Sequence, residues 1–166
     1  TFIEVAAKAG FNLNGWRLQI YTITTNSIPV VVGSYPLTQT VPADTPEYGF
    51  VVVGEANTSP DITLTNSLDQ IIPLGIRLLN EVGGIEQAIV FEGYISGFAP
   101  LFVIDDAFFD DSCMEGVSLT GAVSNGFEWT SYVPLTPGAI NNGQTFGAVP
   151  TTMDPPDAEW MTISNG

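Results

Sequence analysis

The sequence contains no histidine, a single cysteine and only three basic residues. Without histidine, the Ser–His and Cys–His pairs of nucleophilic catalysis are excluded, and so are zinc sites that use His or paired Cys ligands. We interpret the single cysteine, Cys113, as a small buried hydrophobic residue or a free thiol, with an intermolecular disulfide as the alternative. No glycine loop is followed by the Lys or Ser of a phosphate-binding motif. Carboxylates are therefore the groups left for chemistry.

The shortage of basic residues makes the chain strongly acidic. It has 18 acidic residues and only three basic ones, Lys8, Arg17 and Arg77, which gives a net charge of −15. We expect no nucleic-acid binding, because phosphate contacts need Lys and Arg, and an anionic membrane surface would repel the chain. The expected partners are cations, basic or other extracellular proteins, or copies of the chain itself in a salt-rich medium that screens the repulsion.

Long hydrophobic runs are also absent. The longest, such as residues 29–32 and 88–91, have the length of strands, so we expect no membrane insertion and find no signal peptide. The chain opens on an apolar strand rather than on an initiator Met. We interpret it as a processed or incomplete chain, so that the missing signal does not argue against secretion. We predict a secreted, extracellular or cell-surface protein.

What the sequence does contain indicates an all-β domain. Short runs of Val, Ile, Thr, Tyr and Phe alternate with turns rich in its 17 Gly and 12 Pro residues. At 166 residues the chain has the length of one domain. We predict an Ig-like, mostly antiparallel β-sandwich with little helix. The expected strands cover residues 2–6, 16–24, 30–34, 37–41, 49–53, 62–64, 76–80, 86–94, 116–119 and 127–132.

The pattern of side chains within these strands predicts the core and the turns. Acidic residues within strands, Glu4 and Glu128, are expected on the solvent face. Gly83 and Gly84 predict a hairpin turn, and residues 67–74 suggest a helical turn that Pro73 ends. The predicted core consists of Phe2 or Ile3, Trp16, Leu18, Ile20, Phe50, Val52, Ile76, Leu78, Val90, Leu119 and Trp129.

Two segments resemble the lamin-tail family, in the form found in secreted bacterial and algal proteins. The first is FIEVAAKAGFNLNGW at residues 2–16, and the second is GVSLTGAVSNGFEWTSYVPLTPGAINNGQTF at residues 116–146, which ends in the long run TPGAINNGQTF. The resemblance implies a lamin-tail-like β-sandwich over residues 1–146. It also implies a module without chemistry of its own, since such domains accompany extracellular nucleases and phosphatases whose catalytic part lies elsewhere.

Residues 147–166 form a Pro-rich spacer and a tail with the pattern of a strand. Relatives of the resembled form carry one further strand before the FIEV segment, and its absence here would leave an exposed sheet edge. The tail, with Trp160, Met161 and Ile163, is predicted to pair with such an edge on a neighbouring chain. The alternative is that the tail folds back onto its own domain or is the stub of a longer protein.

The densest group of carboxylates is the candidate metal site. Calcium takes six to eight oxygen ligands, and two Asp-Asp pairs around an Ala-Phe-Phe segment supply them, although not in the spacing of an EF-hand. The alternative is a solvated acidic loop that its phenylalanines hold against the core. Two of these carboxylates could in principle act as the acid and base of a glycosidase, but nothing in the sequence fixes the separation that this reaction needs. The residues are Asp105, Asp106, Asp110, Asp111 and Glu115.

Three functions remain open, and none of them is catalysis by this chain. The first is a non-catalytic extracellular structural or assembly module that associates with itself or with a matrix through sheet edges, with calcium as the one cofactor considered. The second is an accessory domain of a larger secreted enzyme of the nuclease or phosphatase type. The third is a carbohydrate- or matrix-binding module that uses surface tryptophans, against which Trp16 and Trp129 are expected in structural positions.

Overall fold

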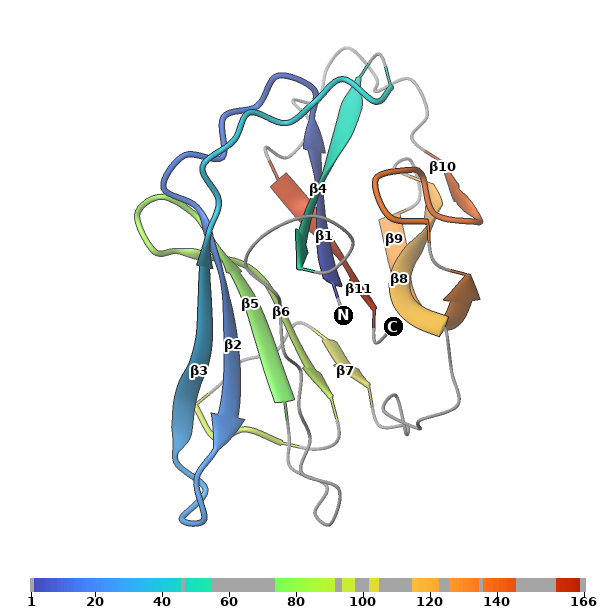
Figure 1. Cartoon of the computed structure of the whole chain (residues 1–166). Helices are drawn as coiled ribbons and strands as arrows, with labels where there is room; N and C mark the ends of the chain where they lie inside the picture. Colours follow the sequence, from blue (N-terminus) through green and yellow to red (C-terminus); the bar gives the residue numbers. More distant parts are fainter. Residues whose placement is uncertain are drawn as a thin grey trace. The chain divides into compact units, whose positions relative to one another are not determined.

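The computed structural model describes residues 2–45, 47–54, 74–91, 94–97, 102–104, 115–122, 126–134, 136–145 and 158–164. The chain divides into two compact units (Figure 1). The first comprises Thr1–Asn12, Thr40–Ile62 and Ser112–Gly166, and the second comprises Leu13–Gln39 and Thr63–Asp111. Each unit contains one sheet.

The sheet of the first unit places the N-terminal strand in its interior. Its order is β10-β8-β11-β1-β4, and β9 pairs with β8. β1 is antiparallel to both of its neighbours, with Ile3 opposite Val53 on one side and Ile163 on the other; only the short β10 runs parallel to its partner. The strands are β1 (Phe2–Lys8), β4 (Tyr48–Gly54), β8 (Glu115–Ala122), β9 (Gly126–Pro134), β10 (Gln144–Thr145) and β11 (Ala158–Ser164).

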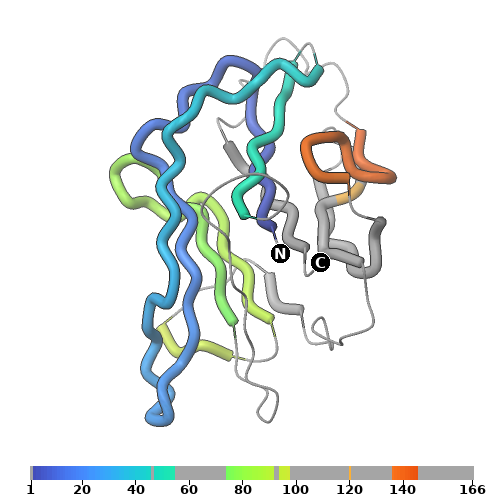
Figure 2. Tube along the Cα trace, in the orientation of Figure 1, coloured from blue at the N-terminus to red at the C-terminus, as the bar shows by residue number. Residues whose placement is uncertain are grey.

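The sheet of the second unit has the order β3-β2-β5-β6-β7. The first four strands are antiparallel neighbours, and β7 runs parallel to β6. Figure 2 follows the long β2–β3 hairpin to its turn, which lies at one end of this sheet. The strands are β2 (Arg17–Ile23), β3 (Pro29–Pro36), β5 (Leu74–Leu79), β6 (Ile85–Phe91) and β7 (Phe102–Ile104).

The predicted all-β fold with mainly antiparallel sheets, the class of a β-sandwich, is confirmed, and no helix occurs among the described residues. Of the predicted strands, residues 37–41 are wrong. This segment contributes only an isolated bridge between Asn12 and Thr40. Pro36 and Pro42 flank it and lack the N–H that a ladder needs, and only its end residues, Leu37 and Val41, are buried. The strand expected at 62–64 and the helical turn expected at 67–74 fall outside the described residues, apart from Leu74 in β5.

The predicted core is largely confirmed. Leu18, Ile20, Ile76 and Leu78 lie on one face of the second sheet and are fully buried, as the alternation in β2 and β5 predicts. Val52 is only half-buried, whereas its neighbours Val51 and Val53 in β4 are buried. Phe2, Ile3, Trp16, Phe50 and Val90 are also buried. The side chains of Leu119 and Trp129 lie outside the described part.

The other face of the second sheet is covered in part by a short crossing segment. Ile95 is fully buried there against Ala88 and Val90, with the half-buried Tyr21 and Ile23 beside them. The guanidinium of Arg77 lies 4.9 Å from the centre of the Tyr21 ring and donates a hydrogen bond to the carbonyl of Gly97 at 3.4 Å. A cation over an aromatic face is attracted by the ring quadrupole. The sheet is thus covered near its middle strands.

The hairpin turn predicted at Gly83 and Gly84 is confirmed. It joins β5 to β6, and Gly83 has a φ of 83°, in the left-handed region that glycine enters without strain. The side chain of Asn80 holds the turn, since its Oδ1 accepts hydrogen bonds from the backbone N–H groups of Val82 (3.2 Å) and Gly84 (2.7 Å).

The tail pairs within its own chain. β11 lies between β1 and β8, antiparallel to both, with Glu4 opposite Thr162 and Val117 opposite Ile163. Of the two predictions for the tail, the structure shows the fold-back. The predicted exposed edge at β1 is therefore wrong, because the last strand of the chain occupies it. The predicted assembly tail, with Trp160, Met161 and Ile163, is instead a strand inside the sheet of its own chain.

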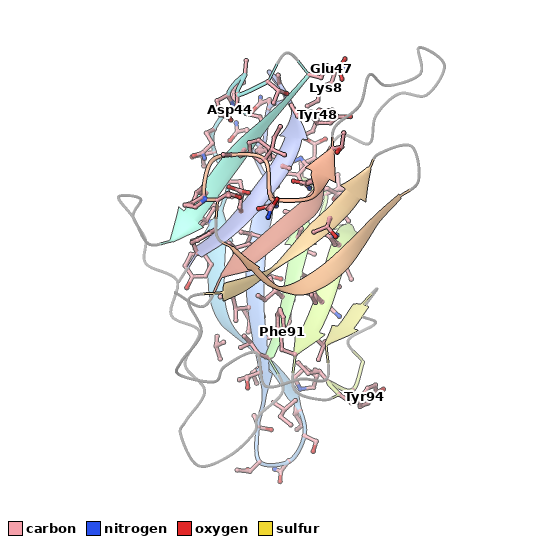
Figure 3. The ribbon with its side chains drawn as sticks, turned by 90° about the vertical axis from the view of Figure 1, so that its right-hand side faces the viewer. Lys8, Asp44, Glu47, Tyr48, Phe91 and Tyr94 are labelled. Atoms are coloured by element: carbon pink, nitrogen blue, oxygen red, sulfur yellow. The ribbon has the colours of Figure 1, made fainter. Side chains whose placement is uncertain are left out.

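The segment before β4 bonds to the first part of its outer edge. Asp44 accepts a hydrogen bond from the backbone N–H of Phe50 through Oδ2 at 2.8 Å. Thr45 donates its N–H to the carbonyl of Tyr48 and accepts the N–H of Tyr48 through its hydroxyl, both at 2.8 Å. Figure 3 shows Asp44 and Tyr48 at the same end of this sheet. Side chains thus satisfy backbone groups that would otherwise mark an open edge.

Gly49→Ala should lower the free energy of unfolding by about 1–3 kcal/mol. A Cβ at position 49 would lie 1.7 Å from the carbonyl oxygen of Pro42, so the backbone would have to move. The matched control is Gly33→Ala, whose Cβ would come nearest to the ring of Tyr35, a side chain that can rotate away. Urea unfolding of both variants checks this; equal losses would contradict the close packing of residues 42–45 on β4.

Candidate functional site

Glu4 is a buried carboxylate in the interior of the first sheet. It lies on β1 between Val52 of β4 and Thr162 of β11, and only 1% of its surface is exposed. The prediction that Glu4 faces solvent is therefore wrong. β1 is buried along six of its seven residues, because strands pair with both of its sides and a loop covers one face. The signal in the sequence was an acid inside an apolar run, which alternation alone assigned to solvent.

The loop that covers Glu4 begins with a turn whose residues suit the contact. Ala139 donates its N–H to the carbonyl of Thr136 at 3.0 Å. Pro137 and Gly138 occupy the two central positions, and Gly138 has a φ of 73°, as a type II turn requires. The N–H of Gly138 donates to Oε2 of Glu4 at 2.5 Å, which joins residues 134 positions apart. Pro137 and Gly138 thus set the turn that presents this donor.

The remainder of the loop is held by its own polar side chains. Thr136 donates its hydroxyl to Oδ1 of Asn141 at 2.9 Å. The Nδ2 and the backbone N–H of Asn141 both donate to Oε1 of Gln144 at 3.3 Å. Asn141 and Gln144 are buried, and Gln144 opens β10, which pairs with β8. The loop at residues 136–145 is therefore attached at two points, through Glu4 at one end and β10 at the other.

The surroundings of Glu4 oppose its ionisation. Burial raises the pKa of Glu4 to about 7, against an ordinary value of 4.5. The hydrogen bond from Gly138 acts in the opposite direction because it favours the carboxylate, and the negative charge of Asp44 raises the pKa further. Figure 3 places Asp44, Glu47 and Lys8 at one end of the same sheet. Glu4 is therefore partly protonated near neutral pH.

The contact between Glu4 and Gly138 attaches the 136–145 loop to the first sheet. The Glu4 carboxylate accepts a hydrogen bond from the backbone N–H of Gly138, which a reacting substrate would have to displace. Within the described ranges, no group of three or more His, Cys, Asp or Glu residues is placed to hold a metal ion. We therefore interpret Glu4 as the buried anchor of the 136–145 loop.

A second candidate feature is the edge of the second sheet at β3. This strand pairs with β2, and no other strand in the described part of the chain pairs with it. Val31 is 48% exposed and Val32 58% exposed, and Ile28 in the preceding turn is 57% exposed. The register shifts between Ile20 and Tyr21, which face Gly33 and Val31, so Val32 is the extra residue of a β-bulge. Apolar side chains thus gather on an open strand.

The other predicted site residues are not brought together by the described structure. Asp105, Asp106, Asp110 and Asp111 lie outside the described residues; Glu115 begins β8, but its side chain is not part of the description. The calcium site stays a prediction. Trp16 is 6% exposed, so it offers no flat surface for stacking a sugar. No sequence signal beyond the apolar run at residues 28–32 indicated β3 as an edge.

Comparisons with protein-family models, curated proteins and solved structures found no match for this chain. The lamin-tail resemblance therefore stays a prediction that depends on the residues quoted above. In the part of the chain that the structure describes, no helix combines the length and the apolar character needed to cross a membrane.

Proposed function

We propose that this chain is a non-catalytic extracellular structural module that associates with copies of itself or with other extracellular proteins through a sheet edge. The observation that carries the proposal is β3, an eight-residue strand that ends its sheet and exposes Val31 and Val32. An open edge strand with exposed apolar residues is a template for pairing with another chain.

The contrast with β4, an edge strand of the first sheet, supports this choice. On the outer side of β4, Asp44 and Thr45 accept hydrogen bonds from the backbone of Phe50 and Tyr48, and β4 is buried along most of its length. β3 has half-buried and exposed residues throughout. Within the residues that the structure describes, its edge is protected only by Pro29 and Pro36 at its ends and by the bulge at Val32. Of the two edge strands β3 and β4, whose side chains the structure describes, β3 is thus the one suited to receive a partner.

The net charge determines the conditions under which association should occur. At −15, two copies repel each other at low ionic strength, whereas roughly 1 M salt reduces the screening length to about 3 Å. We therefore expect self-association to increase with salt. Hydrophobic burial at the edge is the attractive contribution, and it does not weaken when charges are screened.

The proposal can be tested by a substitution that places a charge on the β3 edge. Val32→Lys should weaken self-association by about tenfold or more, because it puts a charge on the edge and removes the apolar side chain that a partner strand would cover. The matched control is Val82→Lys, on the exposed β5–β6 turn, where Val82 is 85% exposed. Each lysine lowers the net negative charge equally, so a general electrostatic effect would strengthen association in both variants.

Sedimentation velocity over a range of concentrations, in low salt and in roughly 1 M NaCl, measures the effect. Circular dichroism confirms that both variants are folded. The proposal is contradicted if the wild-type chain stays monomeric under all conditions and also binds no added strand peptide of the β3 sequence. It is equally contradicted if Val32→Lys and Val82→Lys behave alike.

A further inference from the structure

We propose that the partner of β3 is β3 of a second copy of this chain, paired antiparallel about a two-fold axis, so that two sheets join into one. This inference rests on the proposed function and identifies the partner and the geometry. A two-fold interface uses the same surface on both copies, so that surface must be complementary to itself.

The distribution of charge favours a second copy as the occupant. Residues 18–43, which contain most of β2 and all of β3, include no charged residue in a chain of net charge −15. A basic partner would find no carboxylate on this segment to pair with. A second copy meets a neutral, apolar segment there, where like-charge repulsion is smallest. The neutral edge therefore suits self-pairing better than the binding of a basic protein.

The sequence of β3 limits the pairing to a short, self-compatible segment. Pro29 and Pro36 stand at its two ends and have no N–H to donate. Between them lie the exposed Val31 and Val32. Antiparallel pairing about an axis near Val32 places the valines of both copies against each other, so that each buries the apolar surface that the other exposes.

The same geometry limits the assembly to two copies. The second sheet of each chain has one β3 edge, and the pairing occupies this edge on both copies. The strand at the other end of the sheet, β7, has three residues and pairs with β6. An isologous pair of this kind closes on itself, whereas attachment of β3 to a different surface would continue into a filament. Dimers are therefore expected rather than larger assemblies.

Disulfide trapping distinguishes the geometries. Cys113 is first replaced by Ser, and Val32→Cys and Thr38→Cys are then made separately in that background. In the antiparallel pair, Val32 lies close to its own copy near the axis. The two copies of Thr38 lie more than about 30 Å apart, given a rise of about 3.3 Å per residue. Oxidation should link the Val32→Cys chains into a dimer and leave the Thr38→Cys chains unlinked. Sedimentation mass should stop at the dimer.

Other outcomes overturn the inference in recognisable ways. If both cysteine variants cross-link, the strands are parallel. If neither cross-links while Val32→Lys still weakens association, β3 binds a different surface of its neighbour. If the chain does not self-associate and Val32→Lys, unlike Val82→Lys, weakens the binding of polylysine, the occupant is a basic chain. In these three cases the proposed function stands and the inference fails. Association that neither Val32→Lys nor Val82→Lys changes contradicts both.

Discussion

The free energy of unfolding should fall as the pH rises from 4.5 to above 7, by about 3 kcal/mol relative to a Glu4→Gln variant. Burial raises the pKa of Glu4 from 4.5 to about 7 in the folded chain. In the unfolded chain the carboxyl is exposed and loses its proton near its ordinary value. Between these two pKa values, the folded state holds a proton that the unfolded state has released.

The sign of the effect follows from proton binding. Stability changes with pH in proportion to the protons bound by the unfolded state minus those bound by the folded state. For Glu4 this difference is negative between pH 4.5 and 7. Its contribution to stability is thus fully present below pH 4.5 and is lost as the pH rises through about 7. A gain in stability over this range would contradict the buried position of Glu4.

Urea unfolding at intervals from pH 4 to pH 9 measures this dependence. The difference between the wild type and Glu4→Gln isolates Glu4, because the other acidic groups titrate in both proteins. Parallel curves for the two would contradict the assignment. In a second variant, Asp44→Asn, the amide oxygen can still accept the Phe50 N–H but carries no charge. Because Asp44 raises the pKa of Glu4, this variant should shift the loss of stability to lower pH.

Phe91→Ala should destabilise the second unit by about 3–5 kcal/mol. Phe91 ends β6, is fully buried and pairs with Leu74 of β5 and Ile104 of β7. Removing its ring costs the transfer free energy of the buried atoms and leaves a cavity that the two neighbouring strands can fill only in part. The effect should be the same at pH 5 and pH 8, since no charge is changed.

The matched control is Tyr94→Ala, three residues further along the chain. Tyr94 is 72% exposed, and Figure 3 labels both side chains. Its removal should change the free energy of unfolding by no more than about 0.5 kcal/mol. Chemical unfolding followed by circular dichroism measures both variants. Similar losses for Phe91→Ala and Tyr94→Ala would contradict the position of Phe91 in the core.

Local patterns in the sequence determined the elements of the fold. Alternation placed Leu18 and Ile20 in the core, because a strand turns every second side chain to the same face. Glycine marked the turn at Gly83, since the backbone conformation there depends on the residue itself. Both properties act over a few residues and can be read without the tertiary structure.

Only the tertiary structure decided which strands are buried on both faces and which sheet edge is open. Alternation assigned Glu4 to solvent, yet a loop 134 residues away covers it and donates to it. The missing neighbour of β1 suggested an open edge, yet the tail fills it. β3 was predicted as an ordinary strand and is the edge of its sheet. Strand order and loop placement depend on contacts between distant segments, and those contacts leave no periodicity in the sequence.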